Sequence, residues 1–575
     1  MNNNRKTKLQ AAVIAVLLSV FMLPVFGDSL DEVENAIPAR RYAAVASAHP
    51  LATSAGEEIL RAGGNAFDAA VAVSAALGVV EPAGSGFGGG GFFLIHRQAD
   101  GKQVMLDARE KAPAAAAADM YLDEAGEFVR TRALNGPLAG GIPGLAAGLV
   151  RLNEEYGRLS LAEALAPAIR VAREGFEVTP RYQRLMGFRA SAMAAYPKTA
   201  EIFMPGGIEN LAVGTKIVQT DLAATIDALA KNGFAGFYDG EVAERLVAGV
   251  QSAGGIWTRA DLRDYNVVER QVISFTYRNL RIVSAPPPSS GGIVLAETLN
   301  VLENYDIKSM DSATRRHVVI EAMRRGYRDR AEYLGDPDFV EIPTEKLISK
   351  NYAKKLAANL SIENATPSDS LPAINNPQEG RHTTHFSVVD ADGNRVAGTL
   401  SVNYPFGAVY APPGTGVLVN NEMDDFSSRP LTPNAYGLIG DVANAIAPGK
   451  RPLSSMTPTF IESPDRIGVL GTPGGSRIIS MVLLGILSFD DGHDPEKWVS
   501  VKRYHHQYQP DEVQFEKGGL NDGEQRDLER RGHRLKEISR NYGNMHAISI
   551  DRANGKLKAA SDPRGEGRAS VIELR

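Results

Sequence analysis

Thr383 is the residue of this chain whose setting could support nucleophilic chemistry. It lies in the run Arg381-His382-Thr383-Thr384, at the start of an expected β-strand. A neutral hydroxyl is a weak nucleophile and needs a nearby base. Cleavage of the chain before Thr383 would provide that base in the same residue, because a free α-amine has a pKa of roughly 7.7–8.0. Thr is also favoured at strand starts by β-propensity alone, so the run by itself leaves both interpretations open.

The residues on either side of Thr383 predict a hairpin that follows a loose segment. An extended pattern covers 384–390 and resumes at 395–403, and the Asp392-Gly393 pair between them suits a tight turn. Residues 361–382 are rich in Pro, Asn, Ser and Asp and show no apolar period. We therefore expect a flexible linker that leads directly to Thr383.

A glycine-rich stretch follows an expected buried helix at 66–80. Gly84, Gly86 and Gly89 satisfy G-x-G-x-x-G. The dinucleotide-binding fingerprint requires a strand before and a helix after these glycines, whereas here a helix precedes them and an expected strand at 91–95 follows. We therefore interpret the stretch as a place where the backbone passes close to another segment.

A second glycine pair, Gly474-Gly475, lies between an expected strand at 467–470 and an expected helix that begins at Ile478. Glycines that open a helix present free backbone N–H groups. Such groups are a favourable place for negative charge.

Further polar residues follow predicted buried segments. Arg109 follows extended residues at 104–106, and three acids within four positions follow an expected strand at 416–420. An Arg among charged neighbours is usually solvated, so these residues alone do not identify a site.

The composition indicates a large soluble globular protein, and its length suggests about four domains at most. The chain has 575 residues, with 62 basic and 68 acidic side chains and a net charge of −6. This charge gives no argument for nucleic acid as a partner. The absence of Cys excludes disulfides, thiolate metal sites and a Cys nucleophile. The middle of the chain, 134–361, is predicted to be mostly helical.

Residues 1–27 have the pattern of a signal peptide. Arg5, Lys6 and Lys8 form a basic start, an apolar run covers 11–21, and Gly27 ends a plausible cleavage site. The alternative is an uncleaved anchor, but the run is short for a spanning helix of about 20 residues. We expect a periplasmic or secreted protein with no stable membrane anchor after cleavage.

Taken together, these stretches make the chain resemble the γ-glutamyltransferases, also called γ-glutamyl transpeptidases or glutathione hydrolases. The most specific blocks are 383–390, 420–427, 451–456 and 474–477. The resemblance implies an α+β N-terminal-nucleophile fold, an αββα sandwich in which two stacked, antiparallel-rich sheets lie between helical layers. It also implies a precursor that cleaves itself at His382-Thr383. The products would be a large subunit, 28–382, and a small catalytic subunit, 383–575, which stay associated as a heterodimer.

The resemblance assigns catalytic roles to five positions. Thr383 would be the nucleophile and the first residue of the small subunit, with Ser401 and Asn403 beside it. Ser401 stands where Thr is more usual in the family, which keeps the hydroxyl. The backbone N–H groups of Gly474 and Gly475 would form the oxyanion hole.

The resemblance also implies a pocket for the amino acid head of a γ-glutamyl donor. A cation would bind the α-carboxylate, acids would bind the α-amine, and a lid residue would cover the pocket. Arg109, with help from Ser454 and Ser455, would bind the carboxylate. Glu422 and Asp425 would bind the amine, and Tyr436 would be the lid residue.

The implied reaction cleaves the γ-glutamyl amide bond of glutathione and related donors through a γ-glutamyl-Thr383 intermediate. Water, an amino acid or a dipeptide amine would accept the acyl group, and the resemblance implies neither a metal nor an organic cofactor. Two alternatives remain: a β-lactam acylase of the glutaryl type with the same fold, and a non-catalytic protein that binds glutamyl peptides.

Overall fold

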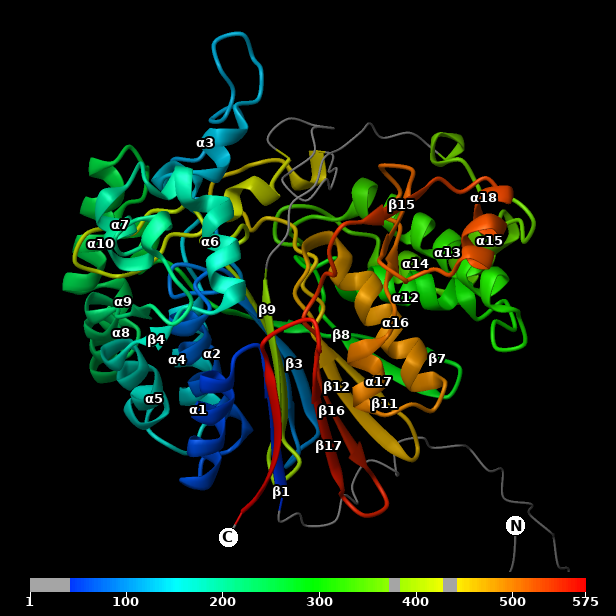
Figure 1. Ribbon diagram of the computed structural model, residues 1–575, viewed down its shortest axis with the longest axis horizontal. Coiled ribbons are helices and arrows are strands. Elements are labelled where there is room, and N and C mark those ends of the chain that lie inside the picture. Colours follow the sequence, from blue (N-terminus) through cyan, green and yellow to red (C-terminus); the bar gives the residue numbers. More distant parts are fainter. Residues whose placement is uncertain (1–41, 372–382, 428–441, 575) are drawn as a thin grey trace, which may run out of the picture. The chain divides into compact units, whose positions relative to one another are not determined.

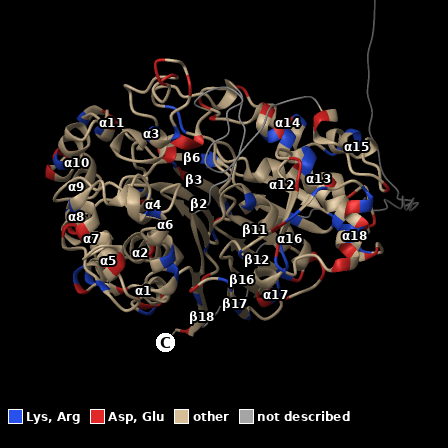
Figure 2. Cartoon of the chain, turned by 45° about the horizontal axis from the view of Figure 1, so that its top comes forward, with Lys and Arg blue, Asp and Glu red and all other residues tan. Residues whose placement is uncertain are grey.

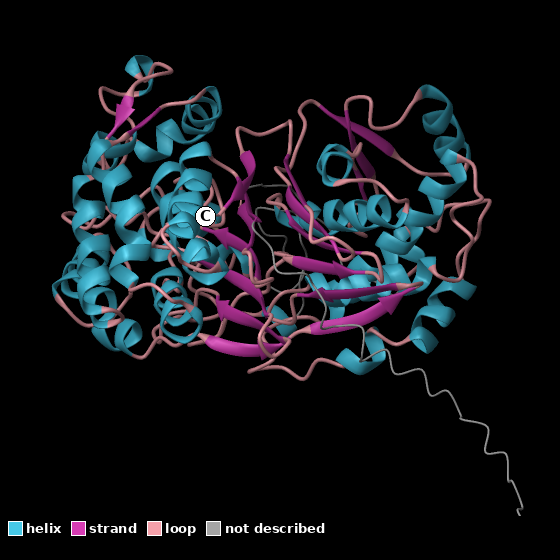
Figure 3. Cartoon of the chain, turned by 90° about the horizontal axis from the view of Figure 1, so that it is seen from below, coloured by secondary structure: helices cyan, strands magenta, loops and turns pink. Residues whose placement is uncertain are grey.

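The computed structural model describes residues 42–371, 383–427 and 442–574, which belong to one compact unit. Two antiparallel sheets lie face to face between layers of helices (Figures 1 and 3). The predicted signal peptide, His382 and Tyr436 lie outside the described residues. No described helix combines the length and the apolar character that a membrane span requires.

The first sheet has seven strands and contains the Thr383 hairpin near its middle. In spatial order its strands are β18 (Arg568–Glu573), β1 (Tyr42–Ser47), β9 (Thr384–Val389), β10 (Arg395–Ser401), β2 (Gly90–Arg97), β3 (Lys102–Ala108) and β6 (Val268–Gln271). Gly393, in the turn between β9 and β10, has a φ of 100°, a value that only glycine adopts at low cost. The hairpin prediction is therefore confirmed.

The second sheet has six strands and stacks on the first. In spatial order they are β17 (Leu557–Ser561), β16 (His546–Asp551), β12 (Arg466–Gly471), β11 (Thr459–Glu462), β8 (Leu280–Ser284) and β7 (Ile273–Tyr277). Two smaller sheets lie outside this sandwich. They contain β13 (Tyr504–His505), β14 (Val513–Glu516) and β15 (Leu535–Ile538), and β4 (Phe176–Glu177) with β5 (Lys216–Ile217).

Helices cover the outer face of each sheet. Helices α1 (Pro50–Arg61), α2 (Ala66–Val80) and α4 (Leu145–Tyr156) contact the strands of the first sheet. On the same side lie α3 (Arg130–Leu134), α5 (Leu161–Glu174), α6 (Pro180–Met193), α7 (Pro197–Phe203), α8 (Thr220–Asn232), α9 (Ala235–Tyr238), α10 (Glu241–Ser252) and α11 (Arg259–Arg263). On the side of the second lie α12 (Gly291–Leu302), α13 (Ser312–Tyr333), α14 (Thr344–Leu347), α15 (Lys350–Ala358), α16 (Ile478–Asp490), α17 (Pro495–Ser500) and α18 (Asp522–Arg530). Acidic and basic residues are interspersed along these outer helices (Figure 2).

The central strands of the first sheet are apolar on both faces because each face packs into a separate core. In β1, Ala43 and Val45 contribute to the core under the first helical layer, whereas Ala44 and Ala46 contribute to the core between the two sheets. Successive side chains of a strand point to opposite faces. Strands that are covered on both faces therefore appear in the sequence as continuous apolar runs.

Helix α2 runs along the Thr383 hairpin and ties both ends of β9. Every residue of α2 is buried, as its sequence, rich in Ala and Val on nearly all faces, predicts. At one end Asp390 accepts a hydrogen bond from the N–H of Ala66 at 2.9 Å. At the other end Glu81 accepts a hydrogen bond from the Thr384 hydroxyl. The helix thereby fixes the strand whose first residue follows Thr383.

The glycine-rich stretch before β2 lies in close contact with the strands around it, as predicted. A Cβ at Gly88 would lie 2.1 Å from the Leu418 carbonyl oxygen, and one at Gly89 would lie 2.1 Å from that of Ser401. Real Cβ atoms do not approach oxygen so closely. Only glycine therefore lets the backbone pass there.

Gly89→Ala should destabilise the protein by about 1–3 kcal/mol, because overpacking forces the backbone to shift. The midpoint of thermal unfolding measures this change. Gly187→Ala is the matched control, because a Cβ there meets no atom within 4 Å and Ala is favoured over Gly within a helix. Equal midpoints for the two variants would contradict the packing argument.

The strand expected at 416–420 does not form. The segment is buried but makes only an isolated bridge between Val419 and Gly88. Its backbone bonds instead join Val419 to Ala408 and Tyr410. The side-chain amide of Asn420 also donates to the carbonyl oxygens of Gly88 and Gly141, each at 2.7 Å. Local backbone bonds and the Asn420 side chain thus fix the segment that leads to the acidic residues.

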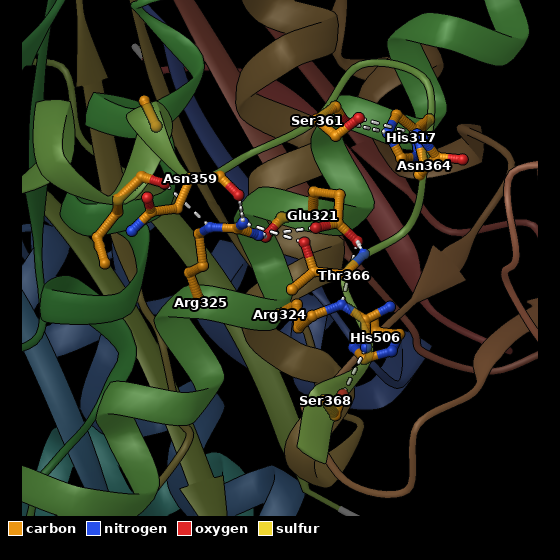
Figure 4. Close-up of polar contacts among 12 residues, drawn as sticks. His317, Glu321, Arg324, Arg325, Asn359, Ser361, Asn364, Thr366, Ser368 and His506 are labelled. Atoms are coloured by element: carbon orange, nitrogen blue, oxygen red, sulfur yellow. Dashed lines mark hydrogen bonds and ion pairs between the residues drawn. The ribbon is translucent and has the colours of Figure 1, made fainter. Parts of the chain in front are cut away.

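The first part of the predicted linker is held by helix α13 (Figure 4). The N–H of Thr366 donates to Glu321 at 3.2 Å, and His317 contacts the Ser361 carbonyl at 2.8 Å. Ser368 donates through its N–H to Asp511 at 2.8 Å. These contacts restrict the predicted linker to the residues after Ser368, and 372–382 lie outside the described residues.

Candidate active site

Thr383 lies at the mouth of the first sheet, directly before β9, and is 4% exposed. The N–H of Gly474 donates a hydrogen bond to Thr383 Oγ1 at 3.1 Å. Gly474 and Gly475 have φ values of 149° and 57°, both in the region that favours glycine. This turn ends β12 and leads into α16, and it directs a backbone donor to the hydroxyl of Thr383.

Ser401 and Asn403 end the neighbouring strand. Leu400 of β10 pairs with Thr384 of β9, so the next position places Ser401 across from Thr383. The Asn403 N–H donates to Ser401 Oγ at 2.7 Å. Asn403 has a φ of 68°, an uncommon backbone conformation that Asn tolerates better than most residues. The strand end thus presents a hydroxyl and an amide side chain next to Thr383.

A buried ion-pair cluster forms the opposite side of the same pocket. The Arg109 guanidinium contacts Glu422 through Nη1 and Asp425 Oδ2 through Nη2, the latter at 2.6 Å. Its Nε donates to the Pro452 carbonyl at 3.2 Å. Arg109 and Glu422 are each 1% exposed, and the Asp425 side chain is 12% exposed. Arg109 is therefore not a solvated surface residue.

The charges of the cluster are set by burial and by each other. Burial alone would lower the pKa of Arg109, but Glu422, Asp425 and Glu110 raise it overall. Burial raises the pKa of Glu422, and Arg109 opposes that rise. Burial also raises the pKa of Glu110 well above its ordinary value, although its Oε2 lies 3.5 Å from Arg109. The pocket thus contains a cation that is paired with acids of the protein itself.

Ser454 and Ser455 lie on the loop that closes the pocket from the second sheet. Ser454 Oγ accepts from the Met456 N–H at 3.1 Å. Arg330 of α13 donates through Nη2 to Ser455 Oγ at 3.3 Å and through Nε to Ser290 Oγ at 2.9 Å. Burial lowers the pKa of Arg330 to about 10. A second buried guanidinium therefore stands behind the loop.

The structure brings the predicted residues into a single pocket. The predicted residues that line it are Arg109, Thr383, Ser401, Asn403, Glu422, Asp425, Ser454, Ser455 and Gly475. Gly474 reaches the pocket through its hydrogen bond to Thr383, whereas Tyr436 lies outside the described residues. The apolar wall of Leu453, Met456 and Ile478 was not predicted from the sequence, and neither were Arg330 and Glu110. Glu110 could have been predicted as a site residue because it follows Arg109 directly in the sequence. No feature of the sequence singles out Arg330.

The two stacked antiparallel sheets, with a Thr at the mouth of a central strand, place this chain in the class of N-terminal-nucleophile hydrolases. A family model described as Gamma-glutamyltranspeptidase matches residues 52–572. The chain is 44% identical to a glutathione hydrolase proenzyme of Pseudomonas sp. (strain A14), over 85% of this chain and 86% of that protein. It is 42% identical to the glutathione hydrolase proenzyme of Escherichia coli (strain K12), over 90% of each.

A solved structure of a cephalosporin acylase from Bacillus halodurans has a TM-score of 0.81 and 28% identity to this chain. The match covers 96% of this chain and 99% of that structure. The fold predicted from the resemblance is thereby confirmed. The chain belongs to the gamma-glutamyltranspeptidase family.

Proposed function

We propose that this chain cleaves the γ-glutamyl amide bond of glutathione and other γ-glutamyl compounds. The γ-glutamyl group passes to water or to the amine of an amino acid or dipeptide. The supporting observation is the charge pattern beside Thr383, where Arg109 faces Glu422 and Asp425 in one buried pocket. A free amino acid head carries the complementary carboxylate and ammonium. Relatives named glutathione hydrolase support the same substrate class.

In this proposal Thr383 Oγ attacks the γ-carbonyl carbon, and its own α-amine, free after cleavage, takes the proton. The oxyanion accepts hydrogen bonds from the N–H groups of Gly474 and Gly475, which are fixed before the reaction begins. The C–N bond breaks, and the amine leaves with the proton. Water or an acceptor amine then attacks the ester and releases Thr383, while Ser401 and Asn403 hold the hydroxyl in place.

We further propose that a precursor cleaves itself between His382 and Thr383, into 28–382 and 383–575. The names of the relatives as proenzymes support this step. The contacts of Ser368 support a lasting association, because its N–H donates to Asp511 at 2.8 Å and its hydroxyl to the Tyr508 carbonyl at 2.7 Å. The end of the large subunit would thus stay bound to the small one.

Release of a chromogenic amine from a γ-glutamyl anilide, with and without an acceptor dipeptide, tests the proposed activity. A glutaryl anilide, which lacks the α-ammonium, is the comparison substrate. We expect release from the γ-glutamyl compound and little from the glutaryl compound. The reverse preference would indicate the acylase alternative, and binding without release from either would indicate a non-catalytic binding protein.

We also propose export to the periplasm or the medium, on the basis of the basic and apolar pattern in residues 1–27. The N-terminus of the large chain, isolated from the periplasmic or extracellular fraction, should begin near Asp28. Edman sequencing or mass spectrometry of that chain measures it. Recovery of the protein in the membrane fraction with Met1 intact would contradict export.

A further inference from the structure

A second pocket lies beside Gly474, next to the residue that donates to Thr383. Helix α6 contributes one wall, and the connection between β15 and β16 contributes the other (Figure 1). Its lining includes Arg181 and Arg184 from α6, Arg540 from the connection, Arg564, and Gly474. The donor pocket described above is lined by Gly475 instead. The two glycines of the turn therefore separate the two pockets.

Two of the four arginines of this second pocket are neutralised by acids. Arg181 contacts Glu81 at 3.3 Å, and Arg564 contacts Glu516 and Asp562 at 2.5 and 3.1 Å. These two side chains are fixed by the protein itself. They therefore contribute little net charge to the pocket.

The other two arginines differ. Arg184 and Arg540 are exposed, and neither has a hydrogen bond or an ion pair with any residue in the described part of the chain. They come from segments more than 350 residues apart in the sequence, yet both line one pocket. The pocket therefore presents two positive charges that no described acid compensates.

We propose that Arg184 and Arg540 bind the carboxylate of the amine partner, that is, of the leaving amino acid or peptide and of the incoming acceptor. The inference rests on the proposed γ-glutamyl transfer. With the acyl part of the donor held by Arg109 and Asp425, the scissile carbonyl lies at Thr383, and its amine side extends past Gly474. An amino acid or short peptide attached there carries its carboxylate only a few bonds from the scissile nitrogen.

The carboxylate takes no part in the bond changes. When the donor is cleaved, the C–N bond breaks and the amine leaves with a proton. In transfer, the acceptor amine attacks the ester, the C–Oγ bond breaks, and the acceptor's proton returns to Thr383. Binding of the carboxylate only orients the amine, so we describe Arg184 and Arg540 as specificity-determining residues.

The experiment compares two γ-glutamyl anilides that differ by a carboxylate on the ring, the 4-nitroanilide and the 3-carboxy-4-nitroanilide. The variants are Arg184→Gln, Arg540→Gln and the double variant. Arg526→Gln is the matched control, because Arg526 on α18 is an exposed Arg that does not line the pocket. The measured quantity is the ratio of kcat/KM for the carboxylated over the uncarboxylated substrate. Because both substrates are measured on one preparation, differences in the active fraction cancel.

We expect this ratio to fall roughly threefold for each single variant and about tenfold for the double variant, mainly through KM, because exposed ion pairs are weak. Arg526→Gln should keep the wild-type ratio. Added salt should lower the ratio in the wild type more than in the double variant, since it screens exposed charges. The acceptors glycylglycine and glycylglycinamide should show the same loss of discrimination.

A double variant that keeps the wild-type ratio for both pairs of compounds would overturn the proposal. That outcome differs from failure of the proposed function itself, in which the wild type would cleave neither anilide. If the ratio fell equally in Arg526→Gln, the effect would come from the overall charge of the protein, and the proposed binding site would likewise be wrong.

Discussion

Thr383→Ala accumulates as a single uncleaved chain and releases no amine from a γ-glutamyl anilide, if Thr383 is both the cleavage nucleophile and the catalytic one. The Gly474 N–H donates to the Thr383 hydroxyl, and an Ala at this position keeps no side-chain oxygen that could attack a carbonyl carbon. Loss of a covalent nucleophile costs on the order of 10⁴–10⁶ in kcat. Gel electrophoresis measures the processing, and anilide cleavage measures the activity.

Thr383→Ser is the control for this variant, because it keeps the hydroxyl and removes only the methyl group. We expect it to yield two chains, more slowly than the wild type, and to keep part of the activity. Cleavage of Thr383→Ala at the same bond would show that another protease makes the cut. Activity in a cleaved Thr383→Ala would exclude Thr383 as the nucleophile.

The parts of the fold that the sequence predicted are those set by local chemistry. The Asp392-Gly393 turn, the Ala- and Val-rich helix at 66–80 and the close-packed glycines all follow from residue types that lie within a few positions of one another in the sequence. The strand expected at 416–420 is wrong for a different reason. The side chain of Asn420 bonds to backbone groups more than 270 residues away, and no local pattern contains that partner.

The same distinction applies to the site. Arg109 contacts acids more than 300 residues later in the chain, so only the family resemblance could relate them. Arg330 lies in a helix segment with many charged residues, and its burial behind Ser455 depends on its bonds to Ser290 and Ser455 and on the packing of α13 against α12. The periodicity of apolar residues and the spacing of motifs do not predict tertiary contacts of this kind.

The pairing of Arg109 with Glu422 and Asp425 requires a donor that carries both a carboxylate and an ammonium. Arg109 and the two acids are paired with one another. A donor carboxylate that binds Arg109 weakens those ion pairs, and the donor ammonium must then compensate the acids. A donor that lacks either charge leaves a buried partner group without compensation, which is costly.

Variants of this cluster should therefore lose most of their activity toward γ-glutamyl donors. Arg109→Lys keeps the charge but loses the bidentate contact that a guanidinium makes with a carboxylate, and Asp425→Asn removes one acid with little change of shape. Loss of one partner of a buried charge pair costs on the order of 2–5 kcal/mol, or roughly 30- to 5,000-fold in kcat/KM. The measurement is kcat/KM for a γ-glutamyl anilide, with the two-chain form confirmed on a gel.

Asp424→Asn is the matched control for Asp425→Asn, since it removes the same charge one position earlier, at a residue that does not line the pocket. We expect its kcat/KM to stay much closer to that of the wild type. The glutaryl anilide, which lacks the α-ammonium, distinguishes the role of Asp425 from that of Arg109. Asp425→Asn should lower the ratio of kcat/KM for the γ-glutamyl over the glutaryl anilide, because it removes the acid that binds the ammonium. Arg109→Lys should instead lower kcat/KM for both anilides and change their ratio less. Wild-type kcat/KM in both Arg109→Lys and Asp425→Asn would mean that the pocket does not bind a free amino acid head, and the acylase alternative would then be the better account of the site.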